Sequence, residues 1–274
     1  MRKRLLTKGL RFAAACASLT CISAYATTVR ITVENLFPDD SLWFSPVFLG
    51  FHDGSFDYFD AGTAASSAVE AIAEQGNPSG LVNEISGVAG SKSAVLKRID
   101  GSGPPDAIFA PGTSNWFDIN LDPTSNRFLS FGSMVVPSND AFFGNDDPMA
   151  HALFDGSGNF NDGFQIDLFG YDIWDAGTEL NDPSRGAAFT LDTTMGTDVT
   201  TMDNIMQHSG LENFVGAHLP VGGTLGSAFS ANQPIARISA QKVPDATPYI
   251  GLMSALGLVG FRFVTRRRMG TAEA

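Results

Sequence analysis

Residues 127–144 read RFLSFGSMVVPSNDAFFG, and this stretch decides the fold. Its first half, residues 127–136, is a long run of apolar and small residues that is typical of a β-strand. Pro137 ends the run, because proline has no amide hydrogen to give to a neighbouring strand. Asp140 follows this end and can point off the sheet edge. The stretch therefore predicts a long strand that delivers a carboxylate to one end of a sheet.

The sequence on either side predicts many more short strands separated by turns. Pro46 interrupts one of the apolar runs and indicates an edge or a bulge there. Residues 87–92 and much of 170–234 are rich in turn-forming residues and are expected to be loops. The remaining strands are expected at residues 28–33, 43–50, 107–110, 116–121, 163–169, 187–191 and 235–240. This pattern favours an antiparallel β sandwich folded as one domain.

Only two helices are predicted. Residues 61–76 form the clearer one, with Thr63 or Ser66 as the N-terminal cap and Gly76 in the left-handed position that ends a helix. Its expected buried stripe comprises Val69, Ile72 and Ala73. A second, short helix is expected at residues 79–85.

Residues 1–26 have the pattern of a signal peptide. A basic start is followed by a short apolar run at residues 12–22 and by Ala24-Tyr25-Ala26, which fits a small-x-small cleavage site. An uncleaved anchor is the alternative, although the run is shorter than the roughly 20 residues of a membrane span. Both cysteines lie in this segment, so the mature chain has no disulfide and no thiol nucleophile. The protein is therefore expected to be exported.

Residues 243–274 have the pattern of a second targeting signal. Val243-Pro244-Asp245 precedes an apolar segment at residues 249–264, and three arginines follow at residues 266–268. This order resembles the bacterial sorting signals of the PEP-CTERM type, with a variant motif, and implies a sorting protease of the exosortase type and a transient membrane segment. A plain tail anchor is the alternative. Either reading places the body, residues 27–242, at the cell surface or outside the cell.

The body is strongly acidic. Residues 27–244 hold 8 basic and 27 acidic residues, a net charge of −19. Such a surface repels the phosphates of nucleic acid, so nucleic-acid partners are not expected. The same charge repels itself within a compact fold unless cations offset it, although solubility alone would also explain it. Calcium is therefore a reasonable partner for an exported acidic domain.

Residues 171–182, YDIWDAGTELND, contain the best candidate metal ligands. Asp175 and Glu179 flank Gly177, whose freedom allows a tight turn, and Asp140 supplies a third carboxylate from the strand end described above. Calcium takes carboxylate, carbonyl and water oxygens, so three converging acids suit it. The four histidines are scattered in sequence, which disfavours zinc. An ordinary solvated turn is the alternative interpretation.

The order of the motifs resembles the spondin domain of F-spondin and mindin. The resemblance implies a sandwich similar to a C2 domain, with a calcium site at one end. It also implies that Asp140, Asp175 and Glu179 are ligands, although mindin-like members have Asp at the last position, and that Asp118 or Asp122 supplies a fourth. The matching stretches are residues 29–36, 45–53, 61–66, 71–77, 129–144, 174–181 and 234–239.

The sequence favours a non-enzymatic function in adhesion or matrix association, with a matrix component, a polysaccharide or a cell-surface component as partner. It lacks the Gly-x-Ser-x-Gly, His-Glu-x-x-His and phosphate-loop motifs of common enzymes. A secreted hydrolase acting on an extracellular polymer is the alternative, because acid pairs are plentiful. A buried carboxylate of raised pKa in a cleft would favour hydrolysis, whereas acids converging at an exposed sheet edge would favour the metal.

Overall fold

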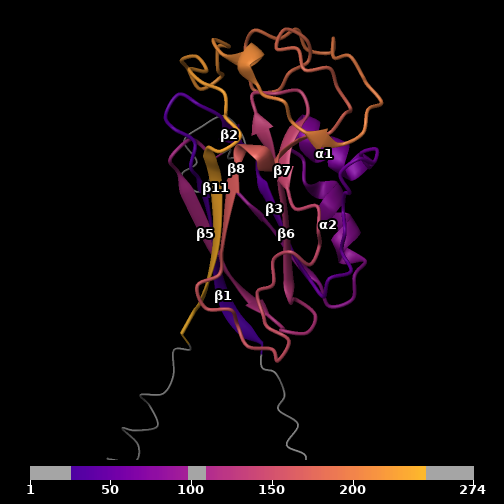
Figure 1. Ribbon diagram of the computed structural model, residues 1–274, viewed down its shortest axis with the longest axis vertical. Helices are drawn as coiled ribbons and strands as arrows, with labels where there is room; N and C mark the ends of the chain where they lie inside the picture. Colours follow the sequence, from indigo (N-terminus) through magenta and orange to yellow (C-terminus); the bar gives the residue numbers. More distant parts are fainter. Residues whose placement is uncertain (1–25, 98–108, 245–274) are drawn as a thin grey trace, which may run out of the picture.

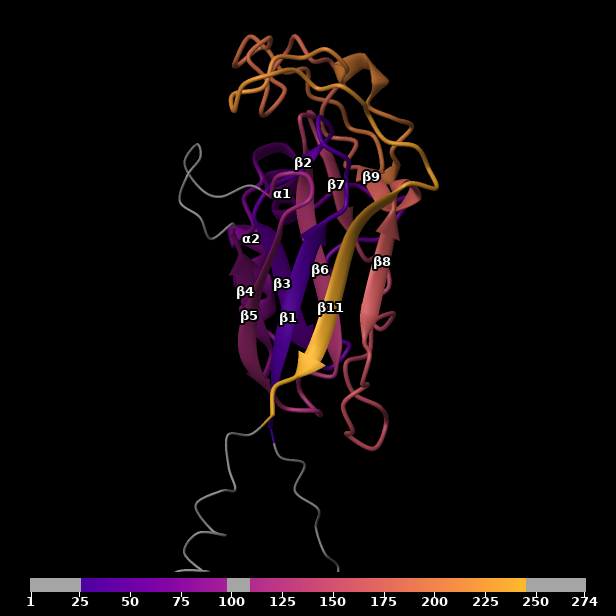
Figure 2. The same cartoon turned by 90° about the vertical axis from the view of Figure 1, so that its left-hand side faces the viewer.

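The computed structural model describes residues 26–97 and 109–244, which form two antiparallel sheets packed face to face (Figure 1, Figure 2). Sheet I has the strand order β5 (Ser114–Leu121), β1 (Thr27–Asn35), β11 (Pro234–Lys242), β8 (Gln165–Phe169). Sheet II has the order β10 (Met206–Gln207), β9 (Ile173–Asp175), β7 (Ala141–Gly144), β6 (Phe128–Val136), β3 (Val47–His52), β4 (Lys92–Leu96), with β2 (Trp43–Phe44) also paired to β6. The predicted antiparallel β sandwich is confirmed.

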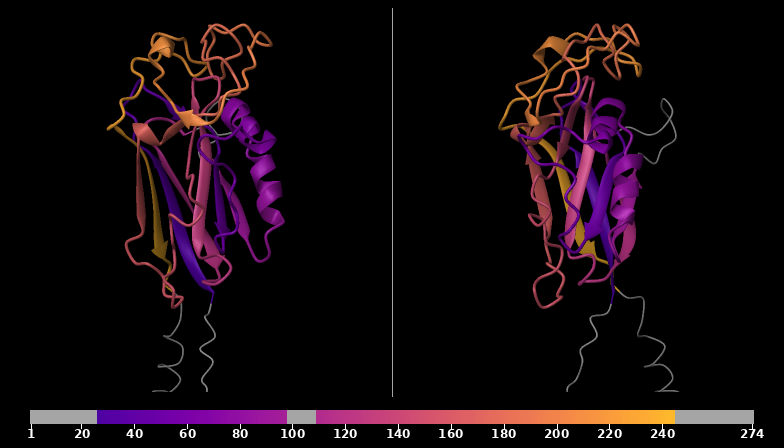
Figure 3. Two further views of the ribbon diagram at one scale, coloured as in Figure 1. Left: turned by 45° about the vertical axis from the view of Figure 1, so that its right-hand side comes forward. Right: turned by 90° about the vertical axis from the view of Figure 1, so that its right-hand side faces the viewer.

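The two sheets differ in how they are covered. In β1 the side chains of Val29, Ile31 and Val33 are fully buried and alternate with partly exposed residues, because only one face of sheet I meets the core. Every residue of β6 and β3 is buried. Sheet II packs against sheet I on one face and against the two helices on the other (Figure 3), so its strands are continuous apolar runs.

Both predicted helices are present with shorter or shifted bounds. Helix α1 spans Ser67–Gln75, and Ser66 is its cap, since the Ser66 hydroxyl accepts a hydrogen bond from the amide of Val69 at 3.3 Å. The expected helical residues 61–66 form turns instead. Gly76 ends α1 with φ at 60°, as predicted, and α2 spans Ser79–Ser86.

Several strand predictions need correction. The run at residues 43–50 is divided into β2 and β3 around Ser45-Pro46, as the proline suggested. Residues 187–191 are not a strand, although Ala188 makes one bridge to Ser138. Strands β4 and β7 were not anticipated. The expected strand at 107–110 is described only from Phe109, which bridges Phe44. The signal peptide and sorting signal, with any helices there, lie outside the described residues except at Ala26, Val243 and Pro244.

A long connection between β9 and β11, residues 176–233, folds over one end of the sandwich and is called the crown below (Figure 1, Figure 3). It contains β10 and a 3-10 turn at Glu212–Phe214. Strand β1 begins and β11 ends at the opposite end of the sandwich. Within residues 26–97 and 109–244, the structure contains no helix of the length and apolarity needed to cross a membrane.

Candidate metal centre

The turn between β6 and β7, residues 137–140, attaches the crown to the sandwich. Asn139 is almost fully buried. Its side-chain oxygen accepts a hydrogen bond from the Asp182 amide at 3.0 Å, and its side-chain amide donates to the Arg185 carbonyl at 2.8 Å. A buried carboxamide with partners on both of its polar atoms fixes the crown backbone at this point.

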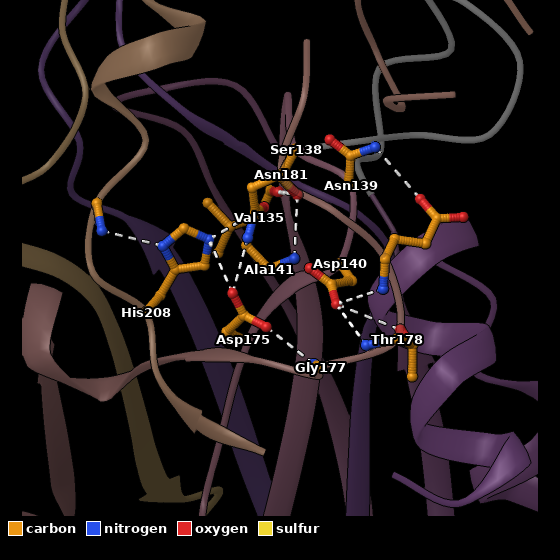
Figure 4. Close-up of polar contacts among 12 residues, drawn as sticks. Val135, Ser138, Asn139, Asp140, Ala141, Asp175, Gly177, Thr178, Asn181 and His208 are labelled. Carbon is orange, nitrogen blue, oxygen red and sulfur yellow. Dashed lines mark hydrogen bonds and ion pairs between the residues drawn. The ribbon is translucent and has the colours of Figure 1, made fainter. Parts of the chain in front are cut away.

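Asp140 is the centre of the acidic cluster. It has no exposed surface, and its Oδ2 accepts hydrogen bonds from the amides of Thr178 at 2.9 Å and Glu179 at 3.0 Å (Figure 4). Its Oδ1 is buried without a hydrogen-bond partner among the described residues. Burial, and secondarily repulsion from Asp175, raises the pKa of Asp140 to about 6. The charged form of this carboxyl is therefore poorly compensated by the protein itself.

Asp175 lies at the end of β9, beside the first residue of β7. Its Oδ1 accepts from the Gly177 amide at 2.8 Å and its Oδ2 from the Asn181 side-chain amide at 2.7 Å. Gly177 has φ at 70°, and a Cβ there would lie 2.5 Å from the Asp203 carbonyl oxygen. The predicted tight turn at Gly177 is confirmed, and only glycine fits it.

His208 approaches Asp175 from the crown and was not anticipated as part of the cluster. Its side chain is 1% exposed, and its Nε2 lies 3.8 Å from Asp175 Oδ2 and 3.4 Å from Asn181 Oδ1. Nδ1 accepts from the Gly210 amide at 3.1 Å, so the neutral ring carries its proton on Nε2. Burial lowers the pKa of His208 against the opposing effect of Asp175. The ring therefore donates toward the cluster instead of offering it a lone pair.

Glu179 contacts Asp140 through its backbone, since its amide donates to Asp140 Oδ2 at 3.0 Å. Its Oε2 accepts from the Asn139 side-chain amide at 3.3 Å. Burial, and then repulsion by Glu74, raises the pKa of Glu179 to about 7, and Asp198 and Asp140 contribute further. Glu74 of α1 also has a raised pKa, caused first by burial. Repulsion from Glu70, Asp140 and Asp198 adds to this effect of burial.

The structure thus brings both predicted partners near Asp140: Asp175 is close enough to repel it, and the Glu179 amide donates to it. Within residues 26–97 and 109–244, no three His, Cys, Asp or Glu side chains converge as a ready-made metal site. The chemistry nevertheless suits a hard cation, because Asp140 has a buried carboxylate oxygen without a partner and a second carboxylate, Asp175, close enough to repel it. Calcium can take its remaining ligands from carbonyl groups and water.

Asp118 does not lie in this cluster. It is on β5 of sheet I, opposite Arg30, and forms a two-pronged ion pair with it at 2.8 and 3.0 Å. This hydrogen bonding lowers the pKa of Asp118. The alternative, Asp122, accepts from the amides of Thr124 and Ser125 in the turn after β5. The structure therefore supplies no fourth carboxylate from this strand, because its acids are occupied locally.

The comparisons with known proteins agree with this fold. The family model described as Spondin_N matches residues 29–210, from β1 to just beyond β10. That range includes Asp140, Asp175 and Glu179. No match was found among curated proteins.

Proposed function

The chain belongs to the spondin domain family, and we propose that it is a non-enzymatic, calcium-stabilised domain that mediates adhesion or matrix association. Spondin domains are typical of extracellular proteins, and this chain is an exported protein of that kind.

The observation that carries the calcium proposal is the unpartnered Oδ1 of Asp140. A buried carboxylate oxygen without a donor is unfavourable, and the neighbouring Asp175 makes the charged form still less stable. Calcium supplies the missing positive charge when it is bound. We assign Asp140 and Asp175 as its principal carboxylate ligands and Glu179 as a further ligand.

The residues around Asp140 suggest what such an ion would do. Asp140 Oδ2 holds the backbone of Thr178 and Glu179, and Asn139 holds residues 182 and 185. Both contacts join the sandwich to the start of the crown. Offsetting the charge of Asp140 would strengthen this junction without any chemical step. The proposed role of calcium is therefore to keep the crown ordered.

Burial argues against the hydrolase alternative. The raised pKa of Asp140 would suit a general acid, but a catalytic carboxyl must touch its substrate. Asp140 has no exposed surface, so an extracellular polymer cannot reach it. A polymer of matrix or cell-surface origin fits better as a binding partner of the crown. The crown lies at the end of the sandwich opposite the points where the chain enters and leaves it (Figure 1).

Thermal unfolding with and without calcium tests the metal proposal. Calcium added to the chelator-treated exported protein should raise its Tm, since binding at one hundred times Kd adds about 2.7 kcal/mol to the folded state. Asp175→Asn should abolish the shift. Asp118→Asn is the matched control, because it removes the same charge from sheet I, and should retain the shift. Identical melting curves with calcium and with EDTA would exclude the proposal.

The adhesion proposal has its own test. The exported protein, immobilised through its C-terminal side, should capture material from the producing cell's own matrix in the presence of calcium. Chelation should release that material if an ordered crown is required. Capture that is equal for the protein and for an unrelated domain of similar net charge would contradict a specific role in adhesion.

A further inference from the structure

A separate pocket of about 620 Å³ lies beside the helices. It is bounded by the α1–α2 connection, the β2–β3 connection, the ends of β4 and β6, and crown residues 188–189. This volume lies within the range of small-molecule sites, roughly 300–1,000 Å³. None of the proposed metal ligands lines it, so its role does not depend on calcium.

The pocket lining is amphipathic. Met134 and Val136, at the end of β6, are buried and give it an apolar wall, to which Phe189 adds an aromatic ring. Polar side chains come from the helix connection, where Asn77 and Ser79 line the pocket. An apolar wall with a few polar groups on one side suits a ligand that has an apolar body and a polar head.

The charge of the lining is opposite to that of the protein. Its described residues include Lys97 and no carboxylate, although the body carries a net charge of −19. The Lys97 carbonyl accepts a hydrogen bond from the Asn115 side-chain amide, which fixes the backbone that bears this lysine. Helix α2 begins at Ser79 and turns its positive end toward the same pocket. An anion bound there would therefore meet a positive local field.

Phe189 is held in a strained conformation at the pocket wall. Its φ is 63°, a left-handed value that is unfavourable for a bulky side chain. Neighbouring bonds maintain it: the Ala188 amide donates to the Ser138 carbonyl at 2.8 Å, and the Leu191 amide to the His218 carbonyl at 2.7 Å. The centroid of its ring lies 5.5 Å from the centroid of the Trp43 ring. Such strain persists where the surrounding structure imposes it and is common at ligand-binding residues.

We propose that this pocket binds a small organic anion with an apolar or aromatic body. The carboxylate lies near Lys97 and the start of α2, and the body packs against Met134 and Phe189. This inference adds a ligand site to the domain and goes beyond the proposed adhesive function.

Methionine methyl NMR gives a readout specific to this pocket. In the exported protein labelled with [¹³C-methyl]methionine, Met134 is 1% exposed, whereas Met149, Met195, Met202 and Met206 are each more than half exposed and lie outside the lining. Titration with 4-phenylbutyrate should shift the Met134 signal saturably and leave the other four in place. The neutral 4-phenylbutanamide should bind more weakly. Shifts confined to the exposed methionines would overturn the proposal.

Two variants locate the binding groups. Lys97→Gln should weaken the binding of 4-phenylbutyrate about fivefold, which is the effect of losing one exposed charge pair, and should leave the binding of 4-phenylbutanamide unchanged. Lys92→Gln is the matched control and should change neither, because Lys92 begins β4, whereas Lys97 follows its last residue, and Lys92 does not line the pocket. Phe189→Gly should weaken the binding of both probes; glycine accepts the positive φ, which offsets part of the stability lost with the packing of the ring against Trp43 and the core. An unchanged preference for the carboxylate in Lys97→Gln would refute the role of this lysine, and unchanged binding in Phe189→Gly would refute the location.

Discussion

Replacing Asp140 by asparagine should remove a pH-dependent destabilisation of the metal-free protein. The pKa of Asp140 is raised from 3.8 to about 6 by burial and by Asp175. Because the folded state binds this proton more tightly than the unfolded state, stability falls as the pH rises from about 4 to about 6. Above that range the difference amounts to about 3 kcal/mol, at 1.36 kcal/mol for each pH unit. Asp140→Asn keeps the size of the side chain and cannot ionise.

The quantity to measure is the difference in the free energy of unfolding between Asp140→Asn and the parent. Urea unfolding, followed by tryptophan fluorescence in chelator-treated buffer from about pH 4 to pH 7, gives both values. The amide leaves a constant penalty, because one of its atoms occupies the position of the unpartnered Oδ1. The diagnostic quantity is therefore the change of this difference with pH. The free energy of unfolding of the variant should rise relative to that of the parent by up to about 3 kcal/mol across this range.

Titrating groups that do not face Asp140 cancel in this comparison. Asp140 helps to raise the pKa values of Glu74 and Glu179, so these two lose part of their destabilising effect in the variant and add to its gain. Burial lowers the pKa values of His52, His151 and His208, so these residues add stability as the pH rises through their folded-state values. They do so in both proteins and cancel in the difference. A difference that stays constant with pH would refute the reasoning, since it would mean that Asp140 is not an uncompensated buried acid.

Three further outcomes are expected. Glu179→Gln should weaken calcium binding less than Asp175→Asn does, because the Glu179 carboxylate already accepts a hydrogen bond from Asn139; equal losses in calorimetry would contradict the lesser role of Glu179. Asn139→Ala should lower the free energy of unfolding by about 2 kcal/mol, since it leaves crown backbone groups without partners, and an unchanged urea midpoint would contradict this. Truncation after Lys242 should release the protein from the membrane fraction; unchanged fractionation would argue against a sorting role for the tail.

The sandwich was predictable because its strands carry their pattern locally. Alternation in β1 and the continuous apolar run of β6 are visible in the sequence, and so are the cap and stop of α1 at Ser66 and Gly76. Short strands such as β9 and β10 were missed, since residues 173–175 and 206–207 gain their conformation only by pairing with distant partners.

The acidic cluster was only partly predictable for a related reason. The turn at Gly177 is local, and the glycine itself makes it predictable from the sequence. The contact of Asp140 with Thr178 spans 38 residues, and the approach of His208 to Asp175 depends on the path of the crown. Asp118 pairs with Arg30, and nothing in its own neighbourhood of the sequence reveals this partner, which is 88 residues away. Sequence patterns identify which acids are available, whereas tertiary packing decides which of them meet.

The position of Asp140 limits what a bound ion can stabilise. Its carbonyl accepts from the Ala176 amide at 3.2 Å and its carboxylate from Thr178 and Glu179, so all these contacts lie at the junction of sheet II with the crown. The core between the sheets contains none of these charges and depends on apolar burial. Calcium should therefore change the order of the crown more than the stability of the sandwich. In the proposed function, calcium keeps the crown ordered for a partner outside the cell, and removal of calcium would release that partner.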